Sequence, residues 1–283
     1  MDTADFDRVA RVLQGGLPAS EIHTDRPSPA RIYDYWLGGR NNYEVDREVA
    51  ETILALAPST RISIRENRNF LLRVVRLLAE QGVEQFLDLG CGLPFAPNVH
   101  EVAQSVNPNA RVVYVDSDPI VLAHAHALME SGDPAHIAVV NADVREVGAI
   151  LDHPDTRRVL DFSEPVGVLM VAVLHFVPDH DDPAGIVGRV LSRFPAGSRL
   201  VISHGTADFN PAGALEATEN YHSTSSYVPR TGASIAALLD GLTMAEPGLV
   251  PIDQWPDTSV PSRAEILGMY AAVAIKPEPE TAS

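Results

Sequence analysis

Two glycines separated by one residue, Gly90 and Gly92, form the part of this chain best suited to holding a ligand. They follow the run Phe86-Leu87-Asp88-Leu89, whose three apolar residues and one acid indicate a buried strand. Residues without a Cβ allow a sharp turn and let a ligand lie against bare backbone. In an open α/β sheet such a turn lies at the carboxyl edge, where ligands bind. We therefore expect the site here, with Asp88 holding the turn or an amino group of the ligand.

Two further acids follow predicted strands. Asp116 ends the apolar run 111–116, where a carboxylate can accept hydrogen bonds from both hydroxyls of a ribose. Asp143 follows the run 136–141, where it can accept a hydrogen bond from an adenine amino group. The alternatives are a surface acid at position 116 and a helix N-cap at position 143. Together the two acids indicate a nucleoside site.

Dinucleotides and S-adenosylmethionine both use a glycine turn of this kind. The dinucleotide fingerprint needs a third glycine three places after the second, where this chain has Phe95. A pyrophosphate also favours basic surroundings, yet Arg111 is the only lysine or arginine between residues 86 and 116. S-adenosylmethionine carries a sulfonium and an ammonium against one carboxylate, so an acidic turn suits it. The pattern favours this cofactor and disfavours a nicotinamide-dependent oxidoreductase.

His175 is the candidate catalytic residue, because it follows the apolar strand expected at 165–173. Methyl transfer from a sulfonium is an in-line displacement that depends mainly on positioning. A base is needed only for a protonated hydroxyl or amine, and an unperturbed histidine, with a pKa near 6.5, can serve as one. The alternative is that His175 only shapes the pocket.

The elements that position these residues alternate along the chain. Strands are expected at 85–89, 111–116, 136–141, 165–173 and 199–203, with helices at 64–81, 96–105, 119–130, 144–151 and 183–194. This alternation predicts an α/β fold with a doubly wound parallel sheet. A loop and helix region at 205–227, a helix at 232–239, and closing strands at 242–246 and 270–276 are expected to follow.

An aromatic segment with Tyr33 and Trp36, closed by Gly38-Gly39, precedes the sheet. It is either a helix that packs aromatics on the core and ends at a glycine, or an aromatic cover over the ligand. We expect residues 1–75 to form an N-terminal helical cap and cofactor cover. Residues 76–276 are the expected methyltransferase-type sheet domain, and 277–283 a disordered tail rich in Pro and Glu.

Composition limits the partners. The formal net charge of -17 over 283 residues would repel a phosphate backbone, so nucleic acid is not expected as a partner. Cys91 is the only cysteine, which rules out an internal disulfide, and no metal site is expected. The acidic N-terminus lacks the order of a signal peptide, and the longest apolar run, 166–177, is too short to span a membrane. We expect a cytoplasmic protein.

The glycine turn, Asp116 and Asp143 together resemble class I S-adenosylmethionine-dependent methyltransferases. More narrowly, the stretches 30–39, 66–71, 86–94, 195–198 and 246–250 resemble the actinobacterial S-adenosyl methyltransferase family, formerly a domain of unknown function. The resemblance implies a Rossmann-like fold and the cofactor S-adenosyl-L-methionine, but no substrate. With it, the expected cofactor-binding residues are Tyr33, Trp36, Asp88, Gly90, Cys91, Gly92, Asp116, Ser117, Asp143, Val144 and Val173.

The expected function is methyl transfer to a small and at least partly apolar acceptor. The alternative is a non-catalytic protein that binds S-adenosylmethionine as a sensor or regulator.

Overall fold

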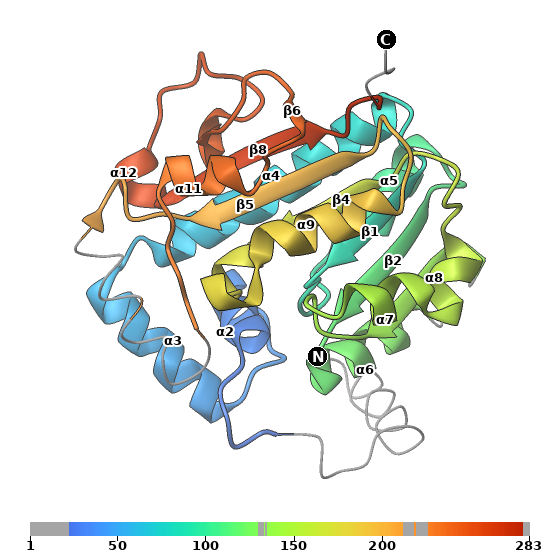
Figure 1. Ribbon diagram of the computed structural model, residues 1–283. Helices are drawn as coiled ribbons and strands as arrows, with labels where there is room; N and C mark the ends of the chain where they lie inside the picture. The colour runs from blue at the N-terminus through green and yellow to red at the C-terminus, as the bar shows by residue number, and fades with distance from the viewer. Residues whose placement is uncertain (1–22, 130–132, 134, 212–217, 219–225, 280–283) are drawn as a thin grey trace.

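Strand β1 (Gln85–Leu89) lies inside the sheet, and all of its residues are buried. A strand covered on both faces by helices needs this apolar character on both sides. Strands β2 (Arg111–Asp116) and β4 (Gly167–Val171) pair with it on either side, both in parallel. Beyond them lie β3 (Ile137–Asn141) and β5 (Arg199–Gly205), also parallel (Figure 1).

The complete order of the sheet is β3-β2-β1-β4-β5-β8-β6, with β7 also paired to β8. Strand β8 (Met269–Ile275) runs antiparallel to β5, whereas β6 (Thr243–Met244) and β7 (Val250–Pro251) are very short. The strand order reverses between β1 and β4, which is where a doubly wound sheet binds its ligands. The predicted α/β doubly wound sheet is therefore confirmed. The structure describes residues 23–129, 133, 135–211, 218 and 226–279.

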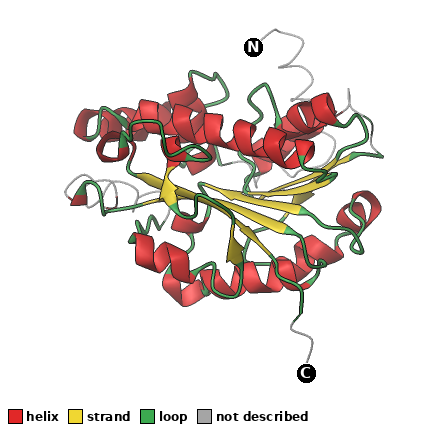
Figure 2. Ribbon diagram, turned by 90° about the horizontal axis from the view of Figure 1, so that it is seen from above, coloured by secondary structure: helices red, strands yellow, loops and turns green. Residues whose placement is uncertain are grey.

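Helices cover both faces of the sheet (Figure 2). Their bounds are α2 Pro29–Leu37, α3 Glu44–Leu56, α4 Thr60–Glu80, α5 Val99–Val106, α6 Pro119–Met129, α7 Val147–Asp152, α8 Pro154–Val159, α9 Pro183–Ser192, α11 Gly232–Ala237 and α12 Ala264–Leu267. Alternate residues of β1 serve opposite faces: Phe86 packs with α4, α5 and α6, and Leu87 packs with α7, α8, α9 and α11. The two halves of the core thus meet through the sheet.

The aromatic segment forms helix α2, which ends at Gly38 with a left-handed φ of 87°. The Asp34 carboxylate accepts hydrogen bonds from the Asn41 amide (2.9 Å) and the Asn42 side chain (2.7 Å). A Cβ on Gly39 would lie 2.0 Å from that carboxylate, so the turn requires glycine there. The segment therefore forms the expected helix with a glycine end, and the Asp34 carboxylate holds the turn that follows the helix.

The expected boundaries differ from the structure in several places. Helix α4 continues through residue 75, where we expected the cap to end. Strand β4 ends at Val171, two residues early, because Ala172 adopts a left-handed φ of 58° and turns the chain. Helices α8 and α12 and strand β7 were not predicted. The residues before 23, most of the region 212–225, and residues 280–283 of the expected tail lie outside the described part of the chain.

Within the described residues, no helix is both long enough and apolar enough to cross a membrane.

Candidate functional site

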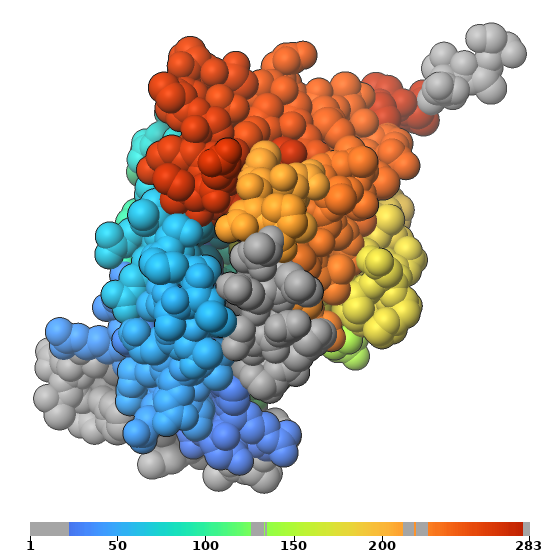
Figure 3. Space-filling model, turned by 90° about the vertical axis from the view of Figure 1, so that its left-hand side faces the viewer, coloured from blue at the N-terminus to red at the C-terminus, as the bar shows by residue number. Residues whose placement is uncertain are grey.

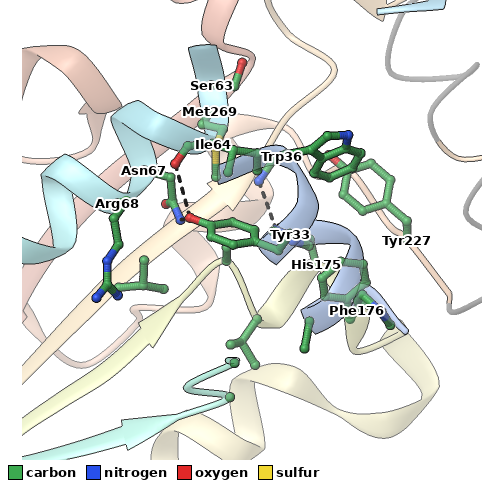
Figure 4. A pocket seen from close by; sticks show the side chains of 18 of the residues that line it. Tyr33, Trp36, Ser63, Ile64, Asn67, Arg68, His175, Phe176, Tyr227 and Met269 are labelled. Atoms are coloured by element: carbon green, nitrogen blue, oxygen red, sulfur yellow. Dashed lines mark hydrogen bonds between the residues drawn. The ribbon is translucent and has the colours of Figure 1, made fainter. Parts of the chain in front are cut away.

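A cavity of about 420 Å³ lies where the carboxyl ends of the parallel strands meet the helical cap. Its size lies within the range of small-molecule sites. Helices α2 and α4, the glycine turn, the segment after β4 and helix α12 all contribute to its wall (Figure 4). On the face in Figure 3, the C-terminal segment, orange to red, lies beside the blue helices α3 and α4.

All of the residues expected to bind the cofactor, together with His175, line this one cavity. They come from positions between 33 and 175, on both sides of the strand-order reversal. That they meet in one place supports the expected site.

The glycine turn is held by β2. The amides of Gly90 and Cys91 both donate to the Val115 carbonyl, at 2.8 and 3.1 Å. Gly90 and Gly92 have φ angles of 71° and 64°, in the left-handed region that favours glycine. A Cβ on Gly90 would come within 2.4 Å of Cγ2 of Val173. The turn therefore presents backbone to the cavity, with Val173 beside it.

Asp116 is fixed by two backbone amides. Its Oδ2 accepts from Gly92 (2.9 Å) and its Oδ1 accepts from Asp118 (2.9 Å). Burial raises the pKa of this carboxyl to about 6, although the amide contacts lower it. Each oxygen of a carboxylate can accept a second hydrogen bond, so Asp116 can still receive ribose hydroxyls. Ser117 follows it along the cavity wall.

Asp88 is only 5 % exposed, and no hydrogen bond to its carboxylate is found among the described residues. Burial raises its pKa to about 7, while the positive charge of Arg68 acts in the opposite direction. Arg68, on α4, donates through Nη2 to the carbonyls of Phe95 (2.5 Å) and Pro97 (2.6 Å). Its Nε is buried and has no hydrogen-bond partner within the described part of the chain. An acid and a guanidinium thus both keep unused bonding capacity on the cavity wall.

Sequence reasoning did not single out Arg68. It is one of several arginines in the predicted helix 64–81, and periodicity does not separate it from the others. The one signal that could have found it is its place in the family-like stretch 66–71. Its partners, Phe95 and Pro97, lie after the glycine turn, far along the chain.

Asp143 is already engaged by a neighbouring cation. Its Oδ1 accepts from the Arg145 amide (2.9 Å) and from Nε of Arg145 (2.8 Å), and Arg145 also reaches Asp181 (3.0 Å). These contacts lower the pKa of Asp143. Glu146 is the residue that precedes α7, so Asp143 is not its N-cap. Asp143 and Val144 both line the cavity.

Tyr33 and Trp36 reach the cavity from α2. The Tyr33 hydroxyl accepts from Nδ2 of Asn67 (2.9 Å) and donates to the Ile64 carbonyl (3.2 Å), as Figure 4 shows. Nε1 of Trp36 donates to the Ala50 carbonyl (3.3 Å), and the indole is 2 % exposed. Each aromatic is therefore a packed residue of the cap that also forms part of the cavity wall.

His175 lies in the 3-10 helix η2 (Leu174–Phe176) rather than at the end of a strand. Its ring is surrounded by other rings: Phe176 at a centroid distance of 4.4 Å, Tyr227 at 5.1 Å and His204 at 5.4 Å. Burial is the main reason that its pKa lies well below its usual value, with His204 and Arg230 adding to the effect.

The Gly205 amide donates to Nδ1 of His175 (3.2 Å), so the neutral ring with this contact carries its proton on Nε2. An imidazole in that state donates a hydrogen bond and does not take up a proton at Nε2. The contact and the low pKa favour a donating or pocket-shaping role for His175. A catalytic role stays a prediction.

A buried arginine fixes η2. Arg230, 6 % exposed, donates to the carbonyls of Leu174 (2.8 Å) and Val177 (2.8 Å) and pairs with Asp179 (2.6 Å). It also contacts Nε2 of His204 at 3.0 Å. Sequence reasoning missed this residue because its partners lie far away along the chain, 26 positions for His204 and more than 50 for Leu174, Val177 and Asp179.

No group of three or more His, Cys, Asp or Glu side chains in the described part of the chain is arranged to hold a metal ion.

The strand order, the glycine turn and the acids within β1 and at the end of β2 are those of a Rossmann-like methyltransferase that uses S-adenosylmethionine. Residues 16–277 match the family described as S-adenosyl methyltransferase, and the chain belongs to that family. It is thus an S-adenosylmethionine-dependent methyltransferase, as the motifs indicated.

Two solved structures are similar over nearly the whole chain. A protein of the DUF574 family from Streptomyces avermitilis is 41% identical, with a TM-score of 0.86, over 90% of this chain and 99% of that one. A proposed methyltransferase from Thermobifida fusca is 36% identical, with a TM-score of 0.85, over 93% and 99%. Both sources are actinobacteria, in line with the resemblance.

More distantly, an O-methyltransferase family protein from Burkholderia thailandensis has a TM-score of 0.52 at 13% identity, over 98% of this chain and 69% of that one. That likeness concerns the fold alone. No curated protein matches the chain.

Proposed function

We propose that this methyltransferase acts on a small, uncharged and largely apolar acceptor. The observation that carries the proposal is the composition of the cavity wall away from the glycine turn. There the larger apolar side chains of the wall are Trp36, Ile53, Ile64, Phe176, Tyr227 and Met269. The polar residues Ser63, Thr206 and Asn210 and the acid Glu265 also line the cavity. Among the described residues, the lysines and arginines of the cavity wall are Arg68 and Arg145, and both lie on the cofactor side. Such a wall suits an aromatic or aliphatic acceptor and offers little to a polyanion.

For the cofactor, we propose that Asp116 accepts from the ribose hydroxyls and that Val144 and Asp143 lie beside the adenine. Asp88 then faces the α-ammonium group, and Nε of Arg68 faces the α-carboxylate. This assignment pairs opposite charges, and it uses Nε of Arg68, which has no hydrogen-bond partner among the described residues. When bound, S-adenosylmethionine supplies an electrophilic methyl group.

The protein's own contribution is positioning and the exclusion of water. Holding donor and acceptor in line can contribute roughly 7–11 kcal/mol toward lowering the barrier. The aromatics of the cap and η2, Tyr33, Trp36 and Phe176, line that part of the site and limit the access of water. His175, with its proton on Nε2, can donate to a polar atom of the acceptor.

A ligand comparison tests the cofactor placement. Arg68→Ala should weaken S-adenosylhomocysteine binding about tenfold or more, since hydrogen bonds to charged groups contribute roughly 1.5–3 kcal/mol. The same variant should leave the affinity for 5′-methylthioadenosine, which has no amino acid end, nearly unchanged. Asp116→Ala is the control, because it should weaken both ligands. Calorimetry on three proteins and two ligands gives the answer, and an equal loss for both ligands with Arg68→Ala would refute the placement.

The acceptor class is tested with methyl-labelled S-adenosylmethionine. The purified protein is incubated with a metabolite extract fractionated by polarity, and separately with DNA, RNA and protein. Label in an apolar small-molecule fraction is the expected result. Label only in a macromolecule would overturn the proposal, and cofactor binding without transfer to any fraction would favour a sensing role.

A further inference from the structure

Ala172 has a backbone conformation that residues with a Cβ rarely adopt. Its φ is 58°, and Asp182 is the only other described residue besides glycine with a positive φ. At Asp182 the reason is local, since its side chain accepts from the Gly185 amide at the start of α9. Ala172 has no such cap and lies on the cavity wall, directly after β4. A left-handed alanine persists only where its surroundings hold it.

A chain of buried hydrogen bonds holds it. The Ala172 amide donates to Oγ of Ser203 (2.9 Å) and, at a longer distance, to the Ser203 carbonyl (3.2 Å). The Ser203 hydroxyl donates to Oδ1 of Asn67 (2.5 Å). Nδ2 of Asn67 then donates to the hydroxyl of Tyr33 (2.9 Å), which donates in turn to the Ile64 carbonyl (3.2 Å). Ser203 is 0 % exposed and Asn67 is 2 % exposed.

The direction of every bond in this chain is fixed. A backbone amide can only donate, so Oγ of Ser203 must accept from Ala172 and has its one proton left for Asn67. Oδ1 of Asn67 therefore faces Ser203, and its NH₂ group faces Tyr33. Buried polar groups that are all satisfied in one arrangement specify that arrangement strongly. This series of hydrogen bonds joins the cap (α2), helix α4 and strand β5 to a single backbone position, Ala172.

That position controls two parts of the cavity. On leaving Ala172, the chain places Val173 against Gly90, where the cofactor turn lies. It then enters η2, which carries His175 and Phe176. A change at Ala172 would shift the residue beside the glycine turn and the aromatic residues facing the acceptor.

We propose that Ser203 and Asn67 are positioning residues: through the Ala172 amide they hold the segment 172–176 in the shape that receives the cofactor and the acceptor. The proposal rests on the proposed placement of the cofactor at Gly90 and Val173. Neither residue needs to touch the cofactor for its loss to weaken binding.

A double-mutant cycle tests it. Ser203→Ala removes the acceptor hydroxyl and its link to Asn67, and leaves the Ala172 amide only the longer contact with the carbonyl of residue 203. S-adenosylhomocysteine should then bind about tenfold more weakly in calorimetry. Ala172→Gly should compensate, because glycine adopts a positive φ without strain. The double variant should thus bind within about threefold of the parent protein, a restoration that a general loss of stability would not produce.

Ser198→Ala is the matched control. Ser198 is also 0 % exposed, and its Oγ accepts from the Val166 amide (3.2 Å) at the other end of the same pair of strands. It should lower the melting temperature without changing affinity by more than about twofold. Unchanged affinity in Ser203→Ala, or no recovery in the double variant, would overturn the proposal.

Hydrogen exchange separates this proposal from the cofactor placement. In the ligand-free protein, the amides of Phe176 and Val177, bonded to Val173 and Leu174, should exchange faster in Ser203→Ala and recover in the double variant. If the parent protein does not bind S-adenosylhomocysteine, the cofactor placement is wrong. If exchange at these amides is unchanged in Ser203→Ala, the positioning role is wrong.

Discussion

Val173 packs so closely on Gly90 that a Cβ built on the glycine would lie 2.4 Å from Cγ2 of the valine. Gly92 has a similar φ, 64° against 71°, yet its Cβ would meet nothing within 4 Å. The two glycines of the turn therefore lack side chains for different reasons. Gly92 needs only its backbone conformation, whereas Gly90 also needs the space.

Gly90→Ala should therefore be more harmful than Gly92→Ala. The left-handed conformation alone costs an alanine roughly 1–2 kcal/mol, so both variants should be destabilised by about this amount. Gly90→Ala must in addition displace Val173 or the turn. Thermal unfolding and calorimetry with S-adenosylhomocysteine should show the larger loss at position 90, and Val173→Ala should recover part of it. Equal losses of stability and affinity at positions 90 and 92 would mean that Val173 can move aside without a measurable cost.

The acids of the cavity should affect stability in opposite directions. Burial raises the pKa of Asp88 to about 7, above its unfolded value of 3.8, so the folded protein binds this proton more tightly. The stability that this raised pKa of Asp88 contributes is fully present below about pH 4 and is lost as the pH rises through about 7. Asp88→Asn should therefore raise the free energy of unfolding at pH 8 and lose that advantage near pH 4. It should also weaken cofactor binding, since the α-ammonium loses its partner.

Asp143→Asn is the control for the direction of this pH dependence of stability. Arg145 lowers the pKa of Asp143, so its contribution is present above the unfolded pKa and is lost as the pH falls through the lower folded value. Removing the charge should leave stability at pH 8 unchanged or reduced, because the carboxylate is partly exposed and its ion pair is screened. Urea unfolding of both variants at pH 4 and pH 8 compares them directly. A destabilised Asp88→Asn at pH 8 would show that its carboxylate has a favourable partner in the folded protein.

Local sequence was enough to predict the parts of the site that depend on neighbours along the chain. The apolar run into Gly90 and Gly92, and the acid that ends β2, follow one another in an order that only a few folds use. The strand expected at 165–173 was too long because its apolar pattern continues through Val173, whereas the chain turns at Ala172. Elements of two to six residues, such as β7 and α8, are too short to show a period.

The residues that organise the site from a distance could not be predicted in this way. Ser203 bonds to Asn67 across 136 positions, and Arg230 reaches the Leu174 carbonyl across 56. A buried serine in a strand and an arginine in a loop look ordinary in a sequence. Their roles follow from the packing of the sheet against the cap.

Arg230→Lys should destabilise the protein although it keeps the charge. A lysine cannot replace the planar fork that bonds the Leu174 and Val177 carbonyls together with Asp179. Each buried carbonyl left without a donor costs roughly 1–3 kcal/mol, so the melting temperature should fall by several degrees. Arg189→Lys is the comparison: its pair with Asp182 is exposed, and the change should cost less than about 0.5 kcal/mol. Similar melting temperatures for the two variants would contradict the organising role of Arg230.

His175 should stay neutral over the pH range in which an unperturbed histidine takes up a proton. Burial, with His204 and Arg230 nearby, lowers its pKa well below the usual value near 6.5, and the Gly205 amide occupies Nδ1. The imidazole NMR resonance that disappears in His175→Gln should therefore not shift between pH 8 and pH 6. Because the unfolded chain gains this proton below about pH 6.5, stability should fall with decreasing pH there, and less so in His175→Gln. A titration midpoint at 6.5 or above would restore His175 as a general base, whereas a flat profile leaves it as a hydrogen-bond donor beside the acceptor.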